Sequence, residues 1–432
     1  MSLRDELREN GDISVAIIGA GIMGMGLMEQ LTRLEGYRPV LLAARHREKL
    51  EKNYASVVGN SYLFTNGKDE ARDAMVKGLP VLTTNNELAW TLNQVDVVVD
   101  CTGDTREGAR INEESILAKK DVVSLNVEVD VLLGPYFRRL AHEYGVTYTG
   151  SAGDEPGAIV ELYEFATMLG LPVIAAGKGK NNPMDRTATP EALAPEAKKR
   201  GLSPRMLTSF VDATNTMIEL NAVANATGLV PNFNGPKGII SSRETLTEDL
   251  RLKEEGGPLE KKGVLDFVHG IAPGVFVLVE SPSENVTREL NYLSMGDGPY
   301  YALYRPYHLT NLETPLSIAK AHLRGEETIA PFKGYVAHTV AVAKRDIKEG
   351  EVLEGIGSGD FYGELVTVST MEEHGYAPIG LITGGQRASR DIKKGQWITT
   401  EDIQWLDERL FKLFRRSYPQ IFHNCHMLTS ML

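Results

Sequence analysis

The chain is poor in cysteine and has no long apolar run. Its two cysteines, Cys101 and Cys425, lie far apart in 432 residues, which excludes both a disulfide framework and the short ligand spacing of a zinc site. The best apolar stretch, residues 264–279, contains charged residues and a proline, and it is too short for a membrane span. The first residues are charged and lack the apolar core of a signal peptide. We therefore expect a soluble, cytoplasmic protein with no membrane partner.

Basic charge is scarce relative to acidic charge. The chain has 46 Lys and Arg against 58 Asp and Glu, so its net charge at pH 7 is −12. Without a basic surplus the chain cannot neutralise many phosphates, which excludes nucleic acid as an expected partner. A hydrophobic content of 42% is typical of globular proteins, and the length exceeds a single core. We expect two or three domains and a small-molecule substrate.

A glycine-rich turn lies between an expected strand and an expected helix. Residues 14–18 are apolar and favour a buried strand, residues 19–24 contain three glycines, and residues 25–34 favour a helix. In such a turn the first glycine allows a tight bend, the second lets a pyrophosphate approach the backbone, and the third lets helix and strand pack closely. The pattern predicts a doubly wound α/β domain that binds a dinucleotide. The expected contacts are Gly19, Gly21, Ile22, Met23 and Gly24.

The end of the second expected strand indicates which dinucleotide binds. Residues 39–43 form this strand, and Arg45 and Arg47 follow it where an NAD-binding domain carries an acidic residue. A guanidinium group at this position binds the 2′-phosphate of NADP. We predict NADP(H) as the cofactor. The alternative is that both arginines are solvated residues at the start of the next helix.

Two later strands of the same domain end in small or polar side chains. Residues 95–100 and 121–126 have this pattern. Because ligands of open α/β sheets collect at the carboxyl ends of the strands, we predict cofactor contacts here. The asparagine that ends the second segment could equally stabilise the turn. The candidate contacts are Cys101, Thr102, Gly103 and Asn126.

The middle of the chain carries candidate catalytic groups. Residues 158–170 favour a helix, residues 171–176 favour a buried strand that ends before two lysines, and residues 209–226 favour a helix with acidic and amide side chains on one face. Burial lowers the pKa of a lysine, which then transfers protons near neutral pH. The alternative is that the lysines lie in a surface turn and that the first acidic residue caps the helix. The catalytic candidates are Lys178, Lys180, Asp212 and Glu219, and Asn181 and Asn215 are candidate substrate contacts.

Residues 298–310 combine several tyrosines with Arg305 and His308. Arginine suits a bidentate contact with a phosphate or carboxylate, and histidine suits proton transfer near neutral pH. We therefore assign Arg305 to substrate binding and His308 to catalysis. The alternative is an ordinary β face with a histidine in the core.

The last hundred residues contain an internal repeat. Residues 344–353 recur as residues 389–398, each copy with an Arg-Asp-Ile-Lys segment followed by a glycine turn. Two such hairpin-like units predict a small β-rich domain, and we interpret their lysines as solvated turn residues. His423 and His426 lie in a tail without regular patterning, so no metal site is assigned to them.

Several of these segments together resemble a known family, the homoserine dehydrogenase-like proteins with a C-terminal SAF domain. The resemblance rests on residues 16–24, 97–103, 153–157, 299–309 and 312–315, with the repeated turns resembling the SAF module. The family includes the 1-deoxy-D-xylulose 5-phosphate reductoisomerase-like enzymes of isoprenoid synthesis, which use NADPH, form 2-C-methyl-D-erythritol 4-phosphate and act as dimers. The domains implied are a Rossmann domain over 1–150, an α/β catalytic and dimerisation domain over 151–330, and a SAF-like β-rich domain with a tail over 331–432.

We predict an NADP(H)-dependent oxidoreductase of the reductoisomerase-like type, acting as a homodimer on a sugar phosphate. A phosphate on the substrate would account for Arg305 and for one strand-end lysine. A helix carboxylate or a divalent metal ion would polarise the hydroxyl and carbonyl groups during the rearrangement. Two alternatives stay open: oxidation of a small hydroxy compound, as in homoserine dehydrogenases, and a non-catalytic sensor that binds NADP(H).

Overall fold

The computed structural model describes residues 2–405 and 408–418, and the chain forms two compact units. The first comprises Met1–Gly157 and Leu309–Ala330, and the second comprises Ala158–His308 and Pro331–Leu432. The three-domain division with boundaries at 150 and 330 stays a prediction. His423 and His426 lie outside the described residues. None of the described helices is both long and apolar enough to cross a membrane.

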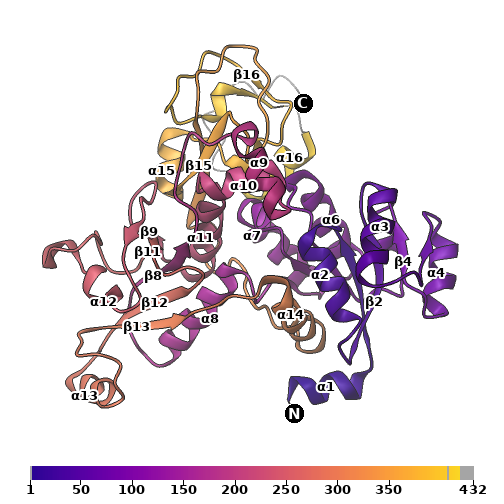
Figure 1. Ribbon diagram of the computed structural model, residues 1–432, viewed down its shortest axis with the longest axis horizontal. Helices are drawn as coiled ribbons and strands as arrows, with labels where there is room; N and C mark the ends of the chain where they lie inside the picture. Colours follow the sequence, from indigo (N-terminus) through magenta and orange to yellow (C-terminus); the bar gives the residue numbers. More distant parts are fainter. Residues whose placement is uncertain (1, 406–407, 419–432) are drawn as a thin grey trace. The chain divides into compact units, whose positions relative to one another are not determined.

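The first unit is an α/β domain. Its strands are β1 (Ile13–Ile18), β2 (Tyr37–Ala43), β3 (Leu63–Phe64), β4 (Val81–Thr83), β5 (Val97–Asp100), β6 (Asp121–Ser124) and β7 (Tyr148–Gly150). Its helices are α1 (Leu3–Asn10), α2 (Ile22–Leu31), α3 (Arg47–Val57), α4 (Lys68–Val76), α5 (Leu88–Thr91), α6 (Thr105–Leu117), α7 (Val127–Tyr144) and α14 (Thr310–Arg324). The last helix comes from far along the chain (Figure 1).

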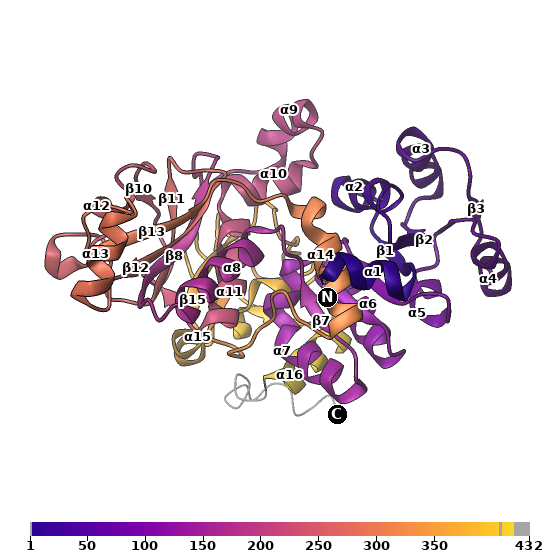
Figure 2. The same ribbon diagram turned by 90° about the horizontal axis from the view of Figure 1, so that it is seen from below.

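The seven strands form one parallel sheet in the order β3-β4-β2-β1-β5-β6-β7. Alternate residues of β1 enter different cores: Val15 and Ile17 pack with residues of α2, α3 and α14, whereas Ala16 and Ile18 pack with residues of α4, α5 and α6. Helices therefore cover both faces of the sheet (Figure 2), as expected for strands that are apolar throughout. The predicted doubly wound α/β fold is confirmed, and the short edge strand β3 was not predicted.

The second unit combines an α/β part with a β-rich part. Its strands are β8 (Val173–Lys180), β9 (Val230–Pro231), β10 (Ile239–Ile240), β11 (Val264–His269), β12 (Val275–Glu280), β13 (Tyr300–Arg305), β14 (Ala337–Ala343), β15 (Phe361–Thr367), β16 (Arg387–Ala388) and β17 (Ile403–Gln404). Its helices are α8 (Glu155–Met168, from Ala158 on), α9 (Pro190–Arg200), α10 (Pro204–Val211), α11 (Thr214–Thr227), α12 (Leu246–Asp249), α13 (Glu284–Tyr292), α15 (Val368–His374) and α16 (Glu408–Ser417), with 3-10 turns η1 (Lys253–Glu255), η2 (Ile379–Leu381) and η3 (Thr400–Asp402).

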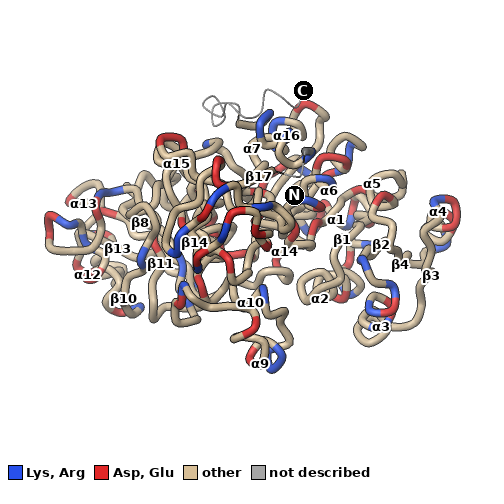
Figure 3. The backbone as a smooth tube through the Cα atoms, turned by 90° about the horizontal axis from the view of Figure 1, so that it is seen from above, with Lys and Arg blue, Asp and Glu red and all other residues tan. Residues whose placement is uncertain are grey.

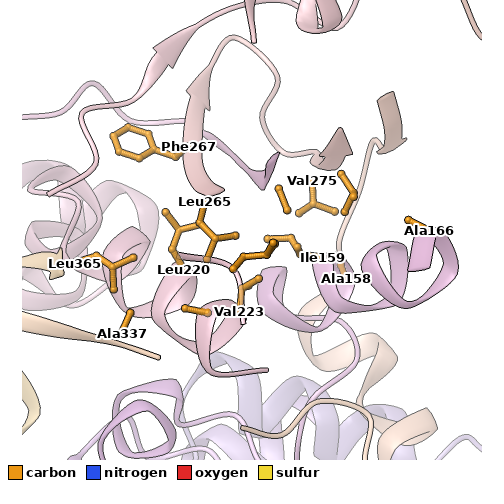
Figure 4. Close-up of a cluster of buried hydrophobic side chains, with 14 of the residues drawn as sticks. Ala158, Ile159, Ala166, Leu220, Val223, Leu265, Phe267, Val275, Ala337 and Leu365 are labelled. Atoms are coloured by element: carbon orange, nitrogen blue, oxygen red, sulfur yellow. The ribbon is translucent and has the colours of Figure 1, made fainter. Parts of the chain in front are cut away.

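The main sheet of this unit has the order β10-β11-β8-β12-β13, with β9 paired to β11. β8 is parallel to β11 and antiparallel to β12. Side chains of α8 and α11, such as Ile159 and Leu220, pack against Leu265 and Val275 of the sheet (Figure 4). This core places α11 directly against the sheet that carries the two candidate lysines.

The structure corrects the prediction for β8. The strand was expected to end at residue 176, but it continues to Lys180 because β11 and β12 flank it on both sides. Gly179 allows this, since a Cβ atom there would lie 2.3 Å from the backbone nitrogen of Ala272. Lys178 and Lys180 are therefore strand residues with side chains on the same face of the sheet.

The structure also corrects the continuous helix expected over 209–226. α10 ends at Val211, and Ala213 has a left-handed backbone with φ of 64°, so that α11 begins only at Thr214. Asp212 stabilises this bend by accepting a hydrogen bond from the Thr214 backbone at 2.8 Å. The expected face shared by Asp212 with the polar residues of α11 is therefore wrong. The expected helix end at Gly228 is confirmed, with φ of 85°.

The two copies of the C-terminal repeat pair with each other. The backbones of Ile347 and Ile392 exchange two hydrogen bonds of 2.8 Å. Asp346 accepts a hydrogen bond from the backbone of Lys394, and Asp391 accepts one from the backbone of Glu349, at 2.9 and 3.0 Å. These reciprocal contacts form a small β-rich module, defined here as residues 337–404. Whether this module is a SAF domain stays a prediction.

Charged side chains are mixed in sign along both units. Figure 3 shows basic and acidic residues interspersed along the helices and loops. Many of the described ion pairs join two exposed groups, such as Arg205 with Glu354 or Lys348 with Asp391. Pairs of this kind add little to the stability of the fold because solvent screens them. Buried pairs are different, and the second unit contains two of them.

Candidate dinucleotide and substrate sites

In the turn after β1, two positions accept only glycine for steric reasons. Gly19 has φ of 109°, and a Cβ atom there would lie 2.5 Å from the carbonyl oxygen of Cys101. A Cβ atom on Gly24 would lie 1.8 Å from the carbonyl oxygen of Gly19. The turn therefore packs against the end of β5 on one side and against the first turn of α2 on the other. This matches the close helix–strand packing expected of a dinucleotide-binding turn.

Gly21 differs from its neighbours because it faces open space. It is the N-cap of α2 with φ of −78°, and no atom lies within 4 Å of a Cβ atom built on it. The next two side chains, Ile22 and Met23, are 56% and 40% exposed. The first turn of a helix has backbone N–H groups without intrahelical partners, and these bind phosphate oxygens. The turn therefore fits the pyrophosphate of a dinucleotide.

The two arginines after β2 have different surroundings. Arg47 begins α3, where it forms an ion pair with Glu51 at 3.0 Å and lies 3.9 Å from the centre of the Phe64 ring. Arg45 is exposed in the loop between β2 and α3. No acidic residue occupies the end of β2, so the loop retains the charge that suits a 2′-phosphate. The assignment of Arg45 and Arg47 to NADP(H) stays a prediction.

Asn126 lies at the carboxyl end of β6 and is completely buried. Its amide nitrogen lies 3.1 Å from oxygen atoms of Asp100, Thr102 and Asp104, and its amide oxygen accepts a hydrogen bond from Val129 in α7. These bonds join the ends of β5 and β6 to the start of α7. They support the alternative role of Asn126 in the turn, and a contact with the cofactor stays a prediction.

The segment after β5 is shaped by this network. Thr102 donates backbone and side-chain hydrogen bonds to Asp100, and Gly103 has φ of 63°. Burial raises the pKa of Asp100 to about 6, although the bonds from Thr102 and Asn126 oppose the shift. Burial also raises the pKa of the Cys101 thiol, which favours the protonated form over the thiolate.

In the second unit, a buried ion pair joins β8 to α11. Lys178 donates a short hydrogen bond to Glu219, and the two side chains are 7% and 6% exposed. Asn215, one turn before Glu219, donates to the other carboxylate oxygen at 2.6 Å. Three of the predicted site residues are therefore brought together, and the spacing of four residues on α11 is the sequence signal for it.

Lys180 lies beside this pair. The residue is 6% exposed, and its ammonium group donates a hydrogen bond to the carbonyl oxygen of Phe210 at 2.6 Å. Burial and the charge of Lys178 lower the pKa of Lys180 to about 8, whereas Asp212 and Glu219 oppose the shift. Burial lowers the pKa of His269 at the end of β11, and the charge of Lys180 lowers it further. A lysine with a pKa near neutral is suited to proton transfer.

The remaining candidates differ in their surroundings. Asp212 forms a buried ion pair with Lys344 of the β-rich module at 2.7 Å. Asn181 is exposed directly after β8. Arg305, at the end of β13, forms an ion pair with Glu161 at 2.7 Å and stacks on Tyr307. His308 is partly buried just beyond this strand. The roles of these residues stay predictions.

Sequence reasoning missed Lys344 and His269. Lys344 was interpreted as a solvated turn residue, but it is only 6% exposed. The available signal was that the second copy of the repeat has Ser389 at the equivalent position. His269 ends a buried strand in the same way as the candidate lysines, and this pattern would have identified it.

Substitution of Gly21 and of Gly24 should separate an effect on folding from an effect on cofactor binding. Gly21→Ala is expected to change the free energy of unfolding by less than about 0.5 kcal/mol, because the added methyl group meets no atom. The same variant should bind NADPH at least about tenfold more weakly, because the methyl group occupies the space of the pyrophosphate. Gly24→Ala should lower both stability and binding. Thermal unfolding and fluorescence titration with NADPH measure these effects, and unchanged NADPH binding by folded Gly21→Ala would contradict the assignment.

The lowered pKa of Lys180 predicts that the residue destabilises the fold at neutral pH. The unfolded chain, with a lysine pKa of about 10.4, binds this proton more tightly than the folded chain, so stability rises with pH between about 8 and 10.4. We expect Lys180→Met to be more stable than the wild type by about 1–3 kcal/mol at pH 7, and by much less at pH 9.5. Urea unfolding at both pH values tests this. A loss of stability of equal size in Lys180→Met at both pH values would contradict this prediction.

Two family models match consecutive parts of the chain. Residues 19–148 match the homoserine dehydrogenase NAD-binding domain, and residues 153–314 match the catalytic domain described as oxidoreductase DRL. The first match contains the glycine turn, and the second contains the lysine cluster of β8 and α11. No curated protein matches the chain.

Solved structures of oxidoreductases are similar in fold at low identity. A probable dehydrogenase from Thermotoga maritima has 14% identity and a TM-score of 0.42, with 74% of this chain and 92% of that chain covered. A putative myo-inositol dehydrogenase from Sinorhizobium meliloti has 13% identity, the same TM-score of 0.42 and the same coverage of 74% and 92%. A putative NADPH-dependent oxidoreductase from Desulfitobacterium hafniense has 13% identity, a TM-score of 0.41, and coverage of 75% and 91%. The two family models show an oxidoreductase with a nicotinamide dinucleotide-binding domain.

Proposed function

We propose that the protein is an NADP(H)-dependent oxidoreductase that reduces the carbonyl group of a small hydroxy-carbonyl substrate, with Lys180 as the proton donor. The observation that carries this proposal is the buried lysine cluster at the end of β8. Lys178 is neutralised by Glu219, whereas Lys180 is bound to a neutral carbonyl oxygen and has a pKa of about 8. Lys180 is therefore the member of the pair that can release a proton near neutral pH.

Each residue of the cluster has a separate task. When bound, NADPH supplies the reducing equivalent to the carbonyl carbon. The ammonium group of Lys180 donates a proton to the carbonyl oxygen, and its positive charge stabilises the negative charge that develops there. Lys178 holds the Glu219 carboxylate beside the site through their ion pair, and Asn215 donates a hydrogen bond to the other oxygen of the same carboxylate. Burial strengthens these electrostatic interactions because little water screens them.

Within this class we favour a reductoisomerase-like reaction on a sugar phosphate. Lys180, whose ammonium group donates to a backbone carbonyl oxygen rather than to a carboxylate, offers positive charge for an anionic substrate, and the segment from β13 to His308 carries the resemblance to the reductoisomerase-like enzymes. Arg305 is paired with Glu161, so a role in phosphate binding requires this partly exposed pair to open. The match of the first unit to a homoserine dehydrogenase domain favours homoserine oxidation as the second candidate. We further propose a homodimer, with residues 331–432 as its SAF-like domain.

Steady-state kinetics with two substrates tests the reaction. We expect the full chain to oxidise NADPH in the presence of 1-deoxy-D-xylulose 5-phosphate, and Lys180→Met to lower kcat by about 10²–10⁴-fold. The control is Lys348→Met, since Lys348 is an exposed lysine of the β-rich module. Reduction of NADP by homoserine would favour the second candidate. Tight NADPH binding without turnover of either substrate would contradict both and favour a sensor.

Cofactor preference depends on the loop after β2. We expect the wild type to prefer NADPH to NADH, and Arg45→Ala to lower kcat/KM for NADPH by about 10–100-fold while that for NADH stays unchanged, because one charge-assisted contact with the 2′-phosphate is lost. Arg47→Ala should have a smaller effect, since Glu51 and Phe64 already hold this guanidinium group. A wild-type preference for NADH would contradict the assignment of NADP(H).

A further inference from the structure

One position breaks the symmetry of the β-rich module. Lys344 and Ser389 occupy equivalent places in the two copies, and each donates a backbone hydrogen bond of 2.8 Å to an aspartate carbonyl, that of Asp360 or that of Asp402. The backbone of the module therefore accepts serine at this position. The side chain of Lys344 nevertheless is buried, which costs desolvation of a charge. The contacts of the ammonium group with Ala188 and Asp212, which lie outside the module, point to a role beyond the repeat.

The Lys344 ammonium group lies close to three oxygen atoms. It donates to the carbonyl oxygens of Ala188 and Ser358 at 2.8 and 2.7 Å, and it lies 2.7 Å from a carboxylate oxygen of Asp212. Two hydrogen bonds to backbone carbonyl oxygens and one ion pair therefore surround this ammonium group. The side chains of Lys344 and Asp212 are 2% and 0% exposed, so both charges depend on this pairing.

Asp212 lies in the bend that anchors Lys180. Its second carboxylate oxygen accepts the backbone hydrogen of Thr214, and its carbonyl oxygen accepts a hydrogen bond from Arg186. Phe210, two residues earlier in the last turn of α10, provides the carbonyl oxygen that binds the Lys180 ammonium group. The ion pair with Lys344 therefore holds the segment from which Lys180 takes its hydrogen-bond acceptor.

We propose that Lys344 is a positioning residue for the lysine site: by pairing with Asp212, it fixes the bend at 212–213 and offsets part of the effect of the Asp212 charge on Lys180. The proposal rests on the proposed function for the part that Lys180 plays in the reaction. The effect on Lys180 itself exists whether or not that reaction is the right one. The β-rich module thus supplies a buried charge to the part of the unit that carries the candidate catalytic groups.

The charged and titratable groups around Lys180 determine what each substitution does. They are Lys178 on β8, Glu219 on α11, Arg186 after β8, His269 on β11, and Asp212 with its partner Lys344. Without Lys344, the unpaired Asp212 carboxylate attracts the Lys180 ammonium group and raises its pKa. Without the Asp212 charge, the remaining Lys344 ammonium group repels Lys180 and lowers that pKa. Removal of both the Lys344 and the Asp212 charge leaves the net charge near Lys180, and therefore its pKa, unchanged.

Competitive acetylation of the full chain, with Lys180 quantified by mass spectrometry across pH, measures these shifts without a substrate. Lys344→Met should lower the acetylation rate of Lys180 at pH 7 by about three- to tenfold, a shift of up to about one pKa unit. Asp212→Asn should raise the rate, and the double variant Lys344→Met/Asp212→Asn should restore the wild-type rate. Lys348→Met is the matched control, because this exposed lysine of the same module pairs with Asp391.

The opposite signs distinguish positioning from a merely structural role. General loosening of the fold would hydrate Lys180 and change its reactivity in the same direction in both single variants, and this result would overturn the proposal. So would an unchanged Lys180 profile in variants that remain folded by circular dichroism. If Lys344→Met does not fold, Asp212→Asn and the double variant still give the predicted rise and recovery. Shifted acetylation profiles combined with unaltered pH profiles of kcat would support the positioning of Lys180 but contradict its assigned role in catalysis.

Discussion

The second unit depends on the pairing of charges that are buried around α11. This helix lies between the main sheet and the β14–β15 hairpin, and nearly all of its residues are inaccessible to solvent. Glu219 of the helix is neutralised by Lys178, and Asp212 just before it is neutralised by Lys344. A buried charge without a partner is strongly unfavourable, so within each pair the carboxylate requires its lysine and the lysine requires its carboxylate. The position of α11 is therefore specified by polar as well as apolar contacts.

The amide side chains of α11 extend the same constraint to the C-terminal module. Asn221 donates to the carbonyl of Ala337 and accepts from the backbone of Thr339, so it bonds to the β14 backbone as a neighbouring strand would. Asn225 accepts hydrogen bonds from the backbone of Val336 and of Ala337. One helix thus contacts the lysine cluster through Glu219 and the β-rich module through its later asparagines. A module distant in sequence is therefore bonded to the helix that pairs with Lys178.

Local sequence patterns were sufficient where the cause of the structure is itself local. The glycine turn, the apolar strands of the first unit and the helix end at Gly228 follow from steric limits and from the repeat of apolar residues. The bend at Asp212 and Ala213 was missed because no glycine or proline indicates it. The end of β8 was misplaced because its last residues are held by flanking strands from later in the chain. The burial of Lys344 depends on acceptors about 14 to 156 positions away.

The sequence by itself determined the doubly wound first unit, its dinucleotide-type turn, and a pair of lysines next to a polar helix. These features arise from backbone sterics and short-range periodicity, which act within a few residues. Only the tertiary structure decided that Lys178 pairs with Glu219, whereas Lys180 binds a backbone carbonyl oxygen and has a lowered pKa. That distinction depends on desolvation and on partners brought together from β8, α11 and the β-rich module. Electrostatic interactions act through space, so their outcome is fixed only when the chain has folded.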